Sequence, residues 1–236
     1  MKQFSNLYIF CFSSALALMV GAALSFTSLA LKDKQEENIE IERQQNILAA
    51  LGVKSTKADV LTKFEQYIRQ SVVIKADGRT VDGETAKDID LKKQNEKPVG
   101  ERLLPLYLAE KDGKSYLVIP VRGAGLWGPI WGNVAVESDM NTICGVTFDH
   151  ASETPGLGAE INTPQFQNQF PNKKLFNEAN RFVSIKVEKI GTYTPNSYTV
   201  DAISGGTITS KALEAMIRNG IEPYQTYFSQ HKSNGQ

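Results

Sequence analysis

The character of the chain changes most sharply within one stretch, Asp201-Ala202-Ile203-Ser204-Gly205-Gly206-Thr207-Ile208-Thr209-Ser210. A short apolar segment at residues 198–201 leads into a Ser-Gly-Gly-Thr turn, and a segment with Leu213, Met216 and Ile217 on one helical face follows. This order predicts a strand, a tight turn and an amphipathic helix. Because two adjacent glycines can reach positive φ and carry no side chain, a ligand could approach the backbone closely at this turn.

The start of the predicted helix has two interpretations. The first N–H groups of a helix lack partners within it, and the helix dipole favours negative charge there, so this end suits a phosphate. Thr207 places a hydroxyl at that point. In the other interpretation, Thr209 or Ser210 caps the helix and the glycines only form a turn. Short glycine motifs often occur by chance, so the stretch alone favours the second interpretation.

Strand signals dominate the region before this turn. Two predicted strands flank a hairpin turn at Lys111-Asp112-Gly113, and two more follow before residue 150. The predicted strands span residues 104–109, 115–121, 130–137, 142–149, 183–187 and 198–201, with a short helix at 164–170. Strands in runs with helices at the ends predict an α+β domain at residues 102–236, with a mainly antiparallel sheet and flanking helices.

The N-terminal region predicts a membrane anchor. Residues 7–31 contain no charged side chain, and as a helix they would measure about 37 Å, more than the roughly 30 Å of hydrocarbon in a bilayer. A cleaved signal peptide with Ser28-Leu29-Ala30 as its processing site is the alternative. The apolar run exceeds the usual signal-peptide core of about 7–15 residues, which favours a retained transmembrane helix after a short tail at residues 1–6. The flanking lysines do not decide the orientation.

Residues 32–101 predict a helical stalk followed by a polar segment. Ile47, Leu48 and Leu51 fall on one face of the stalk, which Gly52 would end. A second helix is predicted to continue through Ile68, with Val60, Leu61, Phe64 and Tyr67 on its buried face. From residue 75 to 101 the chain has few apolar residues and predicts a surface loop or insertion.

Composition and missing motifs exclude several functions. The chain has 26 Lys and Arg against 26 Asp and Glu, so nothing favours binding to nucleic acid. Its two cysteines, Cys11 and Cys144, form no cluster that could hold an iron–sulfur centre. No glycine fingerprint of a dinucleotide-binding unit occurs, so NADH is expected to bind elsewhere, and we expect no metal site.

Three blocks of sequence resemble one known family. Residues 201–207 are similar to the flavinylation motif Asp-x-x-Ser/Thr-Gly-Ala-Thr of membrane redox pumps, with Gly206 in place of the usual alanine. Residues 153–158 resemble the Glu-Thr-Pro-Gly-Leu-Gly signature of the same FMN-binding domain. Residues 125–132, Gly-Leu-Trp-Gly-Pro-Ile-Trp-Gly, resemble the NqrC family of sodium-translocating NADH:quinone reductases more than the related flavin-carrying subunit of Rnf complexes. The resemblance covers about residues 115–224 and the N-terminal anchor.

The resemblance implies one covalent FMN per chain, joined by a phosphoester bond to Thr207. It implies that the remaining cofactor-binding residues come from the three blocks, namely Ser204, Gly205, Gly206, Thr209, Glu153, Thr154, Gly156, Leu157, Gly158 and Trp127. From the residues alone, the 153–158 segment is either an ordinary turn with a solvated glutamate or a loop closing over the flavin, with Leu157 on the ring face. Trp127 and Trp131 could stack on a flavin or fill a core.

The resemblance also implies a function and partners. It describes a single-pass protein of the inner membrane with its C-terminal domain in the periplasm, which relays electrons but is not catalytic alone. The surrounding six-subunit complex oxidises NADH, reduces quinone and moves Na⁺; it includes a further subunit with a second covalent FMN, and iron–sulfur-bearing membrane subunits. A separate flavin transferase attaches FMN from FAD. The alternatives are the flavin-carrying subunit of an Rnf-type ferredoxin:NAD oxidoreductase and a non-redox, membrane-tethered scaffold in which Thr207 is unmodified.

Overall fold

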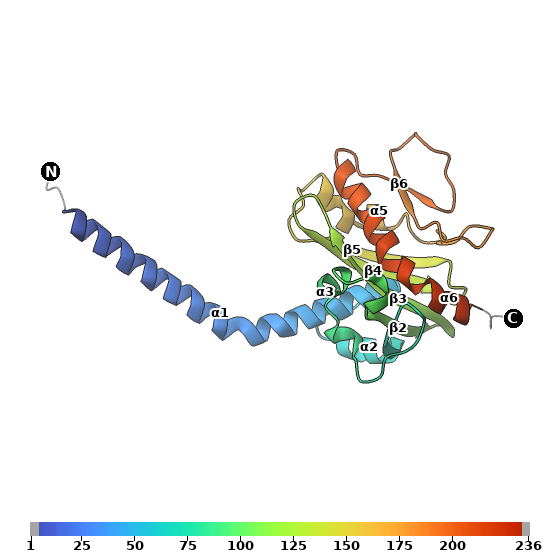
Figure 1. Ribbon diagram of the computed structural model, residues 1–236, viewed down its shortest axis with the longest axis horizontal. Coiled ribbons are helices and arrows are strands. Elements are labelled where there is room, and N and C mark those ends of the chain that lie inside the picture. Colours follow the sequence, from blue (N-terminus) through green and yellow to red (C-terminus); the bar gives the residue numbers. More distant parts are fainter. Residues whose placement is uncertain (1–4, 233–236) are drawn as a thin grey trace. The chain divides into compact units, whose positions relative to one another are not determined.

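The structure is a computed structural model that describes residues 5–232, so most of the predicted tail at residues 1–6 lies outside it. Residue contacts divide the chain into two units, residues 1–43 and 44–236. Helix α1 (Asn6–Ala50) is continuous (Figure 1). An 18-residue window near its N-terminus has a mean hydropathy of 2.1 and is not buried. By length and composition α1 can cross a bilayer, although a signal sequence has the same properties.

The second unit is built on a five-stranded antiparallel sheet in which each strand pairs with the next in sequence. The strands are β1 (Ile68–Ile74), β2 (Leu104–Lys111), β3 (Lys114–Ala124), β4 (Pro129–Glu137) and β5 (Ile143–His150). Asp112 and Gly113 both have positive φ and join β2 to β3 in the predicted hairpin. The predicted α+β class and the four strands between residues 104 and 149 are confirmed.

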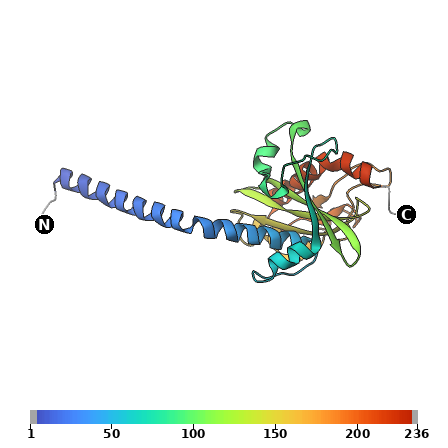
Figure 2. The ribbon, with the colours of Figure 1, turned by 90° about the horizontal axis from the view of Figure 1, so that it is seen from below.

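Helices cover both faces of the sheet. Helices α5 (Thr207–Ile221) and α6 (Gln225–His231) lie on one face, and α2 (Val60–Tyr67) lies on the other (Figure 2). The α5 side holds the larger core, in which apolar residues of β3 and α5 are buried together. On the other side the predicted face of the stalk is buried, with Ile47, Leu48 and Leu51 at most 4% exposed. This arrangement fixes α5, and therefore its first residue, against a rigid sheet.

The first strand differs from the sequence prediction. The sequence predicts a helix through Ile68 with Leu61 buried, whereas α2 ends at Tyr67 and Leu61 is 60% exposed. Residues 68–74 instead form β1, which pairs with β2. The run Val72-Val73-Ile74 explains the difference, because β-branched side chains favour a strand that can bury them.

The remaining elements are short, and some differ from the prediction. In the polar segment, η1 (Ala86–Asp88), α3 (Leu91–Asn95) and η2 (Val99–Glu101) replace a plain loop. Residue contacts place this segment in the second unit, residues 44–236. Beyond β5 lie η3 (Gly158–Asn162), α4 (Pro164–Gln167) and η4 (Glu222–Tyr224). Strands β6 (Lys186–Glu188) and β7 (Thr199–Asp201) pair in parallel. The predicted strand at 183–187 starts later, because Ser184 has a φ of 59°.

Candidate functional site

The Ser-Gly-Gly-Thr turn connects β7 to α5 as the sequence predicts. Gly205 has a φ of 72°, in the region that favours glycine. A Cβ atom at Gly205 would also lie 2.6 Å from Cδ2 of Leu157. Glycine is therefore required at position 205 for two reasons: the positive φ of the backbone and the close approach of the 153–158 loop.

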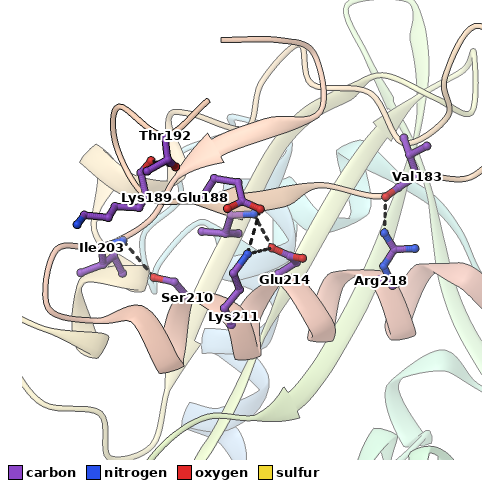
Figure 3. Close-up of polar contacts among 10 residues, drawn as sticks. Val183, Glu188, Lys189, Thr192, Ile203, Ser210, Lys211, Glu214 and Arg218 are labelled. Carbon is purple, nitrogen blue, oxygen red and sulfur yellow. Dashed lines mark hydrogen bonds and ion pairs between the residues drawn. The ribbon is translucent and has the colours of Figure 1, made fainter. Parts of the chain in front are cut away.

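Thr209 and Ser210 do not cap α5. The N-cap residue is Gly206, and no side chain caps the first N–H groups of the helix. Thr209 is 2% exposed and its hydroxyl donates to Oε2 of Glu153 at 2.6 Å. Ser210 is fully buried, and its Oγ accepts from the backbone N–H of Ile203 at 3.1 Å (Figure 3). The capping interpretation is therefore wrong, and the start of α5 keeps unpaired donors.

Thr207 lies at the first position of α5 and is exposed. Within residues 5–232 its hydroxyl makes no hydrogen bond. A pocket of about 510 Å³ opens beside it between β6 and the start of α5. Its lining comes from three segments and comprises Val187, Glu188, Lys189, Ile190, Ala202, Ile203, Ser204, Gly205, Thr207, Ser210 and Lys211. A hydroxyl that is free, exposed and next to a pocket of this size is accessible to modification.

Glu153 is the point where the three sequence blocks meet. It is 4% exposed, so the interpretation as a solvated residue is wrong. Its Oε1 accepts from the backbone N–H of Trp127 at 2.9 Å, and its Oε2 accepts from Thr209. Its own backbone N–H donates to Nδ1 of His150 at 3.3 Å. Glu153 thus joins the turn before β4 to the first turn of α5 through its carboxylate, and both to the end of β5 through its backbone.

The surroundings of Glu153 favour its charged form. Burial raises the pKa of the Glu153 carboxyl, but the hydrogen bonds from Thr209, Trp127 and Leu126 lower it by more, so the pKa lies below the ordinary 4.5. Both oxygens are used by protein donors. Glu153 therefore acts on the site by holding its segments together.

Gly158 shows how tightly this junction is packed. A Cβ atom at this position would overlap Oε2 of Glu153 and Oγ1 of Thr209, the two atoms joined by the buried hydrogen bond. Any larger residue would force the 153–158 loop away from α5. The glycine of the motif is thus explained by packing against the carboxylate.

Large apolar side chains around the junction remain exposed. Leu126, Trp127, Leu157 and Ile208 are 46%, 66%, 41% and 61% exposed. Each belongs to a segment that is hydrogen-bonded to Glu153, contains Glu153 or adjoins the Ser-Gly-Gly-Thr turn. Thr154 and Gly156 are also exposed, in the same loop as Leu157. Exposed apolar side chains with a few polar groups beside them are the usual character of a site for a flat ring system.

Trp131, the second tryptophan that the sequence suggested for stacking on a flavin, lies away from this junction. Trp131 is on β4, paired across the sheet with Arg122, whose guanidinium lies 5.9 Å from its ring centre.

The pocket wall also contains charged residues that the sequence did not predict, Glu188, Lys189 and Lys211. One signal could have found Lys211, because it lies four residues after Thr207 and therefore on the same helix face. Glu188 and Lys189 carry no such local signal, since only the pairing of β6 with β7 brings them to the pocket.

Comparisons with known proteins agree with these blocks. The sequence profile of the FMN-binding domain family matches residues 125–222. The NqrC subunit of the Na(+)-translocating NADH-quinone reductase of Vibrio vulnificus (strain YJ016) is 34% identical over 216 residues, covering 84% of each chain. The same subunit of Haemophilus ducreyi is 30% identical over 234 residues, covering 90% of each chain. The chain belongs to the NqrC family.

A solved member of the NqrC family has the same fold. The crystal structure of the Parabacteroides distasonis protein superposes with a TM-score of 0.78 at 37% sequence identity, covering 84% of this chain and 97% of that one. Against the usual motif of the family, Gly206 is the one departure in the turn. A Cβ atom there would lie 2.9 Å from Cγ2 of Ile203. An alanine would therefore require Ile203 to move, whereas glycine fits beside it.

Proposed function

We propose that this NqrC-family chain is anchored in the inner membrane and carries FMN as a phosphoester on Thr207. The family supports an FMN-bearing electron-transfer subunit of a sodium-translocating NADH:quinone reductase. The observation that carries the covalent linkage is the free, exposed hydroxyl of Thr207 at the uncapped start of α5.

The residues around Thr207 fit an FMN phosphate and ring. The unpaired N–H groups of the first turn of α5 would donate to phosphate oxygens, and the helix dipole would favour the negative charge. The pocket of about 510 Å³ is within the usual range for small-ligand sites. Leu157 and Trp127 present exposed apolar surface for the ring system.

Attachment needs a phosphoryl donor, which we take to be FAD bound to a flavin transferase. The Thr207 oxygen forms a bond to the phosphorus of the FMN half, and the hydroxyl proton leaves to a base of the transferase. The bond between that phosphorus and the bridging oxygen to AMP breaks, so AMP is released. The chain supplies the acceptor and its exposure, and the exposed turn gives the transferase access.

FMN, once bound, supplies the capacity to accept and donate single electrons. The residues of this chain fix its position: Glu153 holds the 125–128 and 153–158 segments against α5, and Leu157 and Trp127 exclude water from part of the ring. A phosphoester also prevents loss of the cofactor to the periplasm. We propose that the electrons pass, within a six-subunit complex, to a second covalent FMN that another membrane protein of the complex carries.

We test the linkage by denaturing electrophoresis of the full chain produced together with the transferase. A fluorescent band should remain at the mass of the chain, because only a covalent flavin survives denaturation. Mass spectrometry of tryptic peptides should place an FMN ester on the peptide that contains Thr207. A chain that carries no flavin after denaturation would exclude the proposed linkage.

Leu157→Ala is expected to change the environment of the ring without releasing it. If the flavin covers Leu157 fully, the change removes roughly 1.5–3 kcal/mol of apolar contact, and Thr154→Ala removes about 0.5–1.5 kcal/mol if its hydroxyl bonds to the ring. Flavin stoichiometry should hold while absorption maxima and reduction potential shift. Leu61→Ala, at an exposed leucine of α2, is the matched control. Unchanged spectra and potentials in both loop variants would make the loop purely structural.

We expect the second unit to face the periplasm and residues 7–31 to be retained. Protease added to spheroplasts should digest the C-terminal unit, and in inverted vesicles it should be protected. N-terminal sequencing should find the start of the chain intact. A mature chain beginning after Ala30, or a domain protected in spheroplasts, would contradict this arrangement.

A further inference from the structure

Lys211 lies one helical turn beyond Thr207, on the same face of α5, and lines the same pocket. Its ammonium donates to Oε1 of Glu188 at 3.2 Å and to Oε2 of Glu214 at 3.0 Å (Figure 3). Burial lowers the pKa of Lys211, but the hydrogen bonds to Glu214 and Glu188 raise it by more, so the pKa lies above its ordinary value. The side chain therefore stays charged at physiological pH.

The two carboxylates hold Lys211 in place and leave it one donor. The same oxygen of Glu214 accepts from the backbone N–H of Val187 at 2.7 Å, which ties α5 to β6. An ammonium has three N–H donors. Glu188 and Glu214 use two of them, so the third is available to a ligand in the pocket.

Lys189 contributes a second cation from the other wall of the pocket. It directly follows β6 and is exposed. Among residues 5–232 its ammonium has neither an ion pair nor a hydrogen bond. Figure 3 shows Lys189 and Lys211 on two different segments, the chain after β6 and helix α5. The lining of the pocket thus includes, with Thr207, the ammonium of Lys211, which two carboxylates hold, and the unpaired ammonium of Lys189.

A phosphate in this pocket would need such cations. The phosphodiester on Thr207 carries one negative charge, and Glu188 lines the same pocket. Two like charges at close range disfavour each other unless cations lie between them. Lysine ammonium groups bind phosphate oxygens as point charges in other proteins.

We propose that Lys189 and Lys211 form a phosphate subsite for the phosphoryl group carried by Thr207. This inference rests on the covalent FMN proposed above. Glu188 and Glu214 hold Lys211 in position before the flavin is attached. Lys189, which directly follows β6, contacts the phosphate from the other side of the pocket. The rival explanation is that Lys211 only cross-links α5 to β6.

The test compares three full-length chains produced together with the transferase: the wild type, Lys189→Met and Lys211→Met. Glu188→Gln breaks an ion pair of Lys211 but keeps the ammonium. Lys63→Met is the control, because it removes an ion pair between α2 and Asp59, the residue before it. The ³¹P NMR signal of the attached phosphodiester should move in both lysine variants of the pocket. It should stay at the wild-type position in Lys63→Met and move less in Glu188→Gln than in Lys211→Met.

Wild-type ³¹P signals in both Lys189→Met and Lys211→Met would overturn the subsite. If these variants instead carry no flavin, Lys189→Arg and Lys211→Arg distinguish the reasons. Restored loading in proteins that melt like the wild type supports the subsite, because arginine keeps the charge; loading that stays absent with arginine refutes it. A wild-type chain without covalent flavin would refute the FMN linkage itself, a separate outcome from either of these.

Discussion

Thr207→Ala is expected to abolish covalent flavin completely while leaving the second unit folded. The change removes the acceptor oxygen at the start of α5, and the two hydroxyls that follow it in the helix, those of Thr209 and Ser210, are buried and hydrogen-bonded. Thr207 itself is exposed and makes no side-chain hydrogen bond within residues 5–232. The free energy of unfolding should therefore change by no more than about 0.5 kcal/mol.

Fluorescence after denaturing electrophoresis and the mass of the intact chain measure the loss. Thr207→Ser should retain part of the flavin, since it keeps a hydroxyl at the same position. Thr85→Ala is the matched control, because Thr85 is an exposed threonine outside the site whose side chain caps nothing. A fluorescent Thr207→Ala chain would contradict the assignment of Thr207 as the flavin acceptor. Loss of flavin in Thr85→Ala would instead indicate a general defect in expression or maturation.

The elements that the sequence predicts well are those with local signals. The hairpin turn at Asp112-Gly113 and the Gly205-Gly206 turn carry their own φ preferences, and the strands around them alternate or run apolar. Strand β1 was not predicted, because the apolar positions of residues 60–68 fit a helical period and only the pairing with β2 shows where the helix must end. Ser184 interrupts a regular alternation in the same way, through a backbone conformation that the tertiary structure imposes.

The candidate site shows the same division between local and long-range signals. Motif resemblance located Thr207, Leu157 and Trp127, and the structure places all three on segments that adjoin one junction. The role of Glu153 could not be predicted, because its partner Thr209 is 56 residues away in the chain. Both interpretations from the sequence, a solvated turn residue or part of a loop over the flavin, omitted a buried carboxylate that ties three segments together.

Glu153→Ala is expected to destabilise the second unit by about 2–4 kcal/mol, because it leaves the Thr209 hydroxyl and the Trp127 N–H without their charged acceptor. Glu153→Gln should cost roughly 1–3 kcal/mol, since one of the two donors would then face an amide NH₂. Urea unfolding of the full chain in detergent measures both. The matched control is Glu160→Gln, a half-exposed carboxylate of η3 that accepts from the backbone N–H of Gly156 at 3.1 Å, where the loss should stay small.

A double-mutant cycle tests the partner directly. Thr209→Val removes the donor with little change in shape, so its effect should be much smaller in a Glu153→Ala background, which has no acceptor, than in the wild type. A coupling of about 1 kcal/mol or more is expected for a buried hydrogen bond to a charged group. Additive effects would show that Glu153 and Thr209 stabilise the unit independently, contrary to the geometry.

The difference in unfolding free energy between the wild type and Glu153→Gln should depend on pH, and the direction of that dependence shows which form of Glu153 stabilises the unit. Its pKa in the folded unit lies below the ordinary 4.5, so the unfolded chain binds the proton more readily. Stability from Glu153 is therefore fully present above about pH 4.5 and is lost as the pH falls through the folded pKa. The gap in unfolding free energy between the wild type and Glu153→Gln should stay constant from neutral pH to about pH 5 and then narrow in acid. A gap that widens in acid would mean that the carboxyl is held in its protonated form, and the buried charged junction would have to be abandoned.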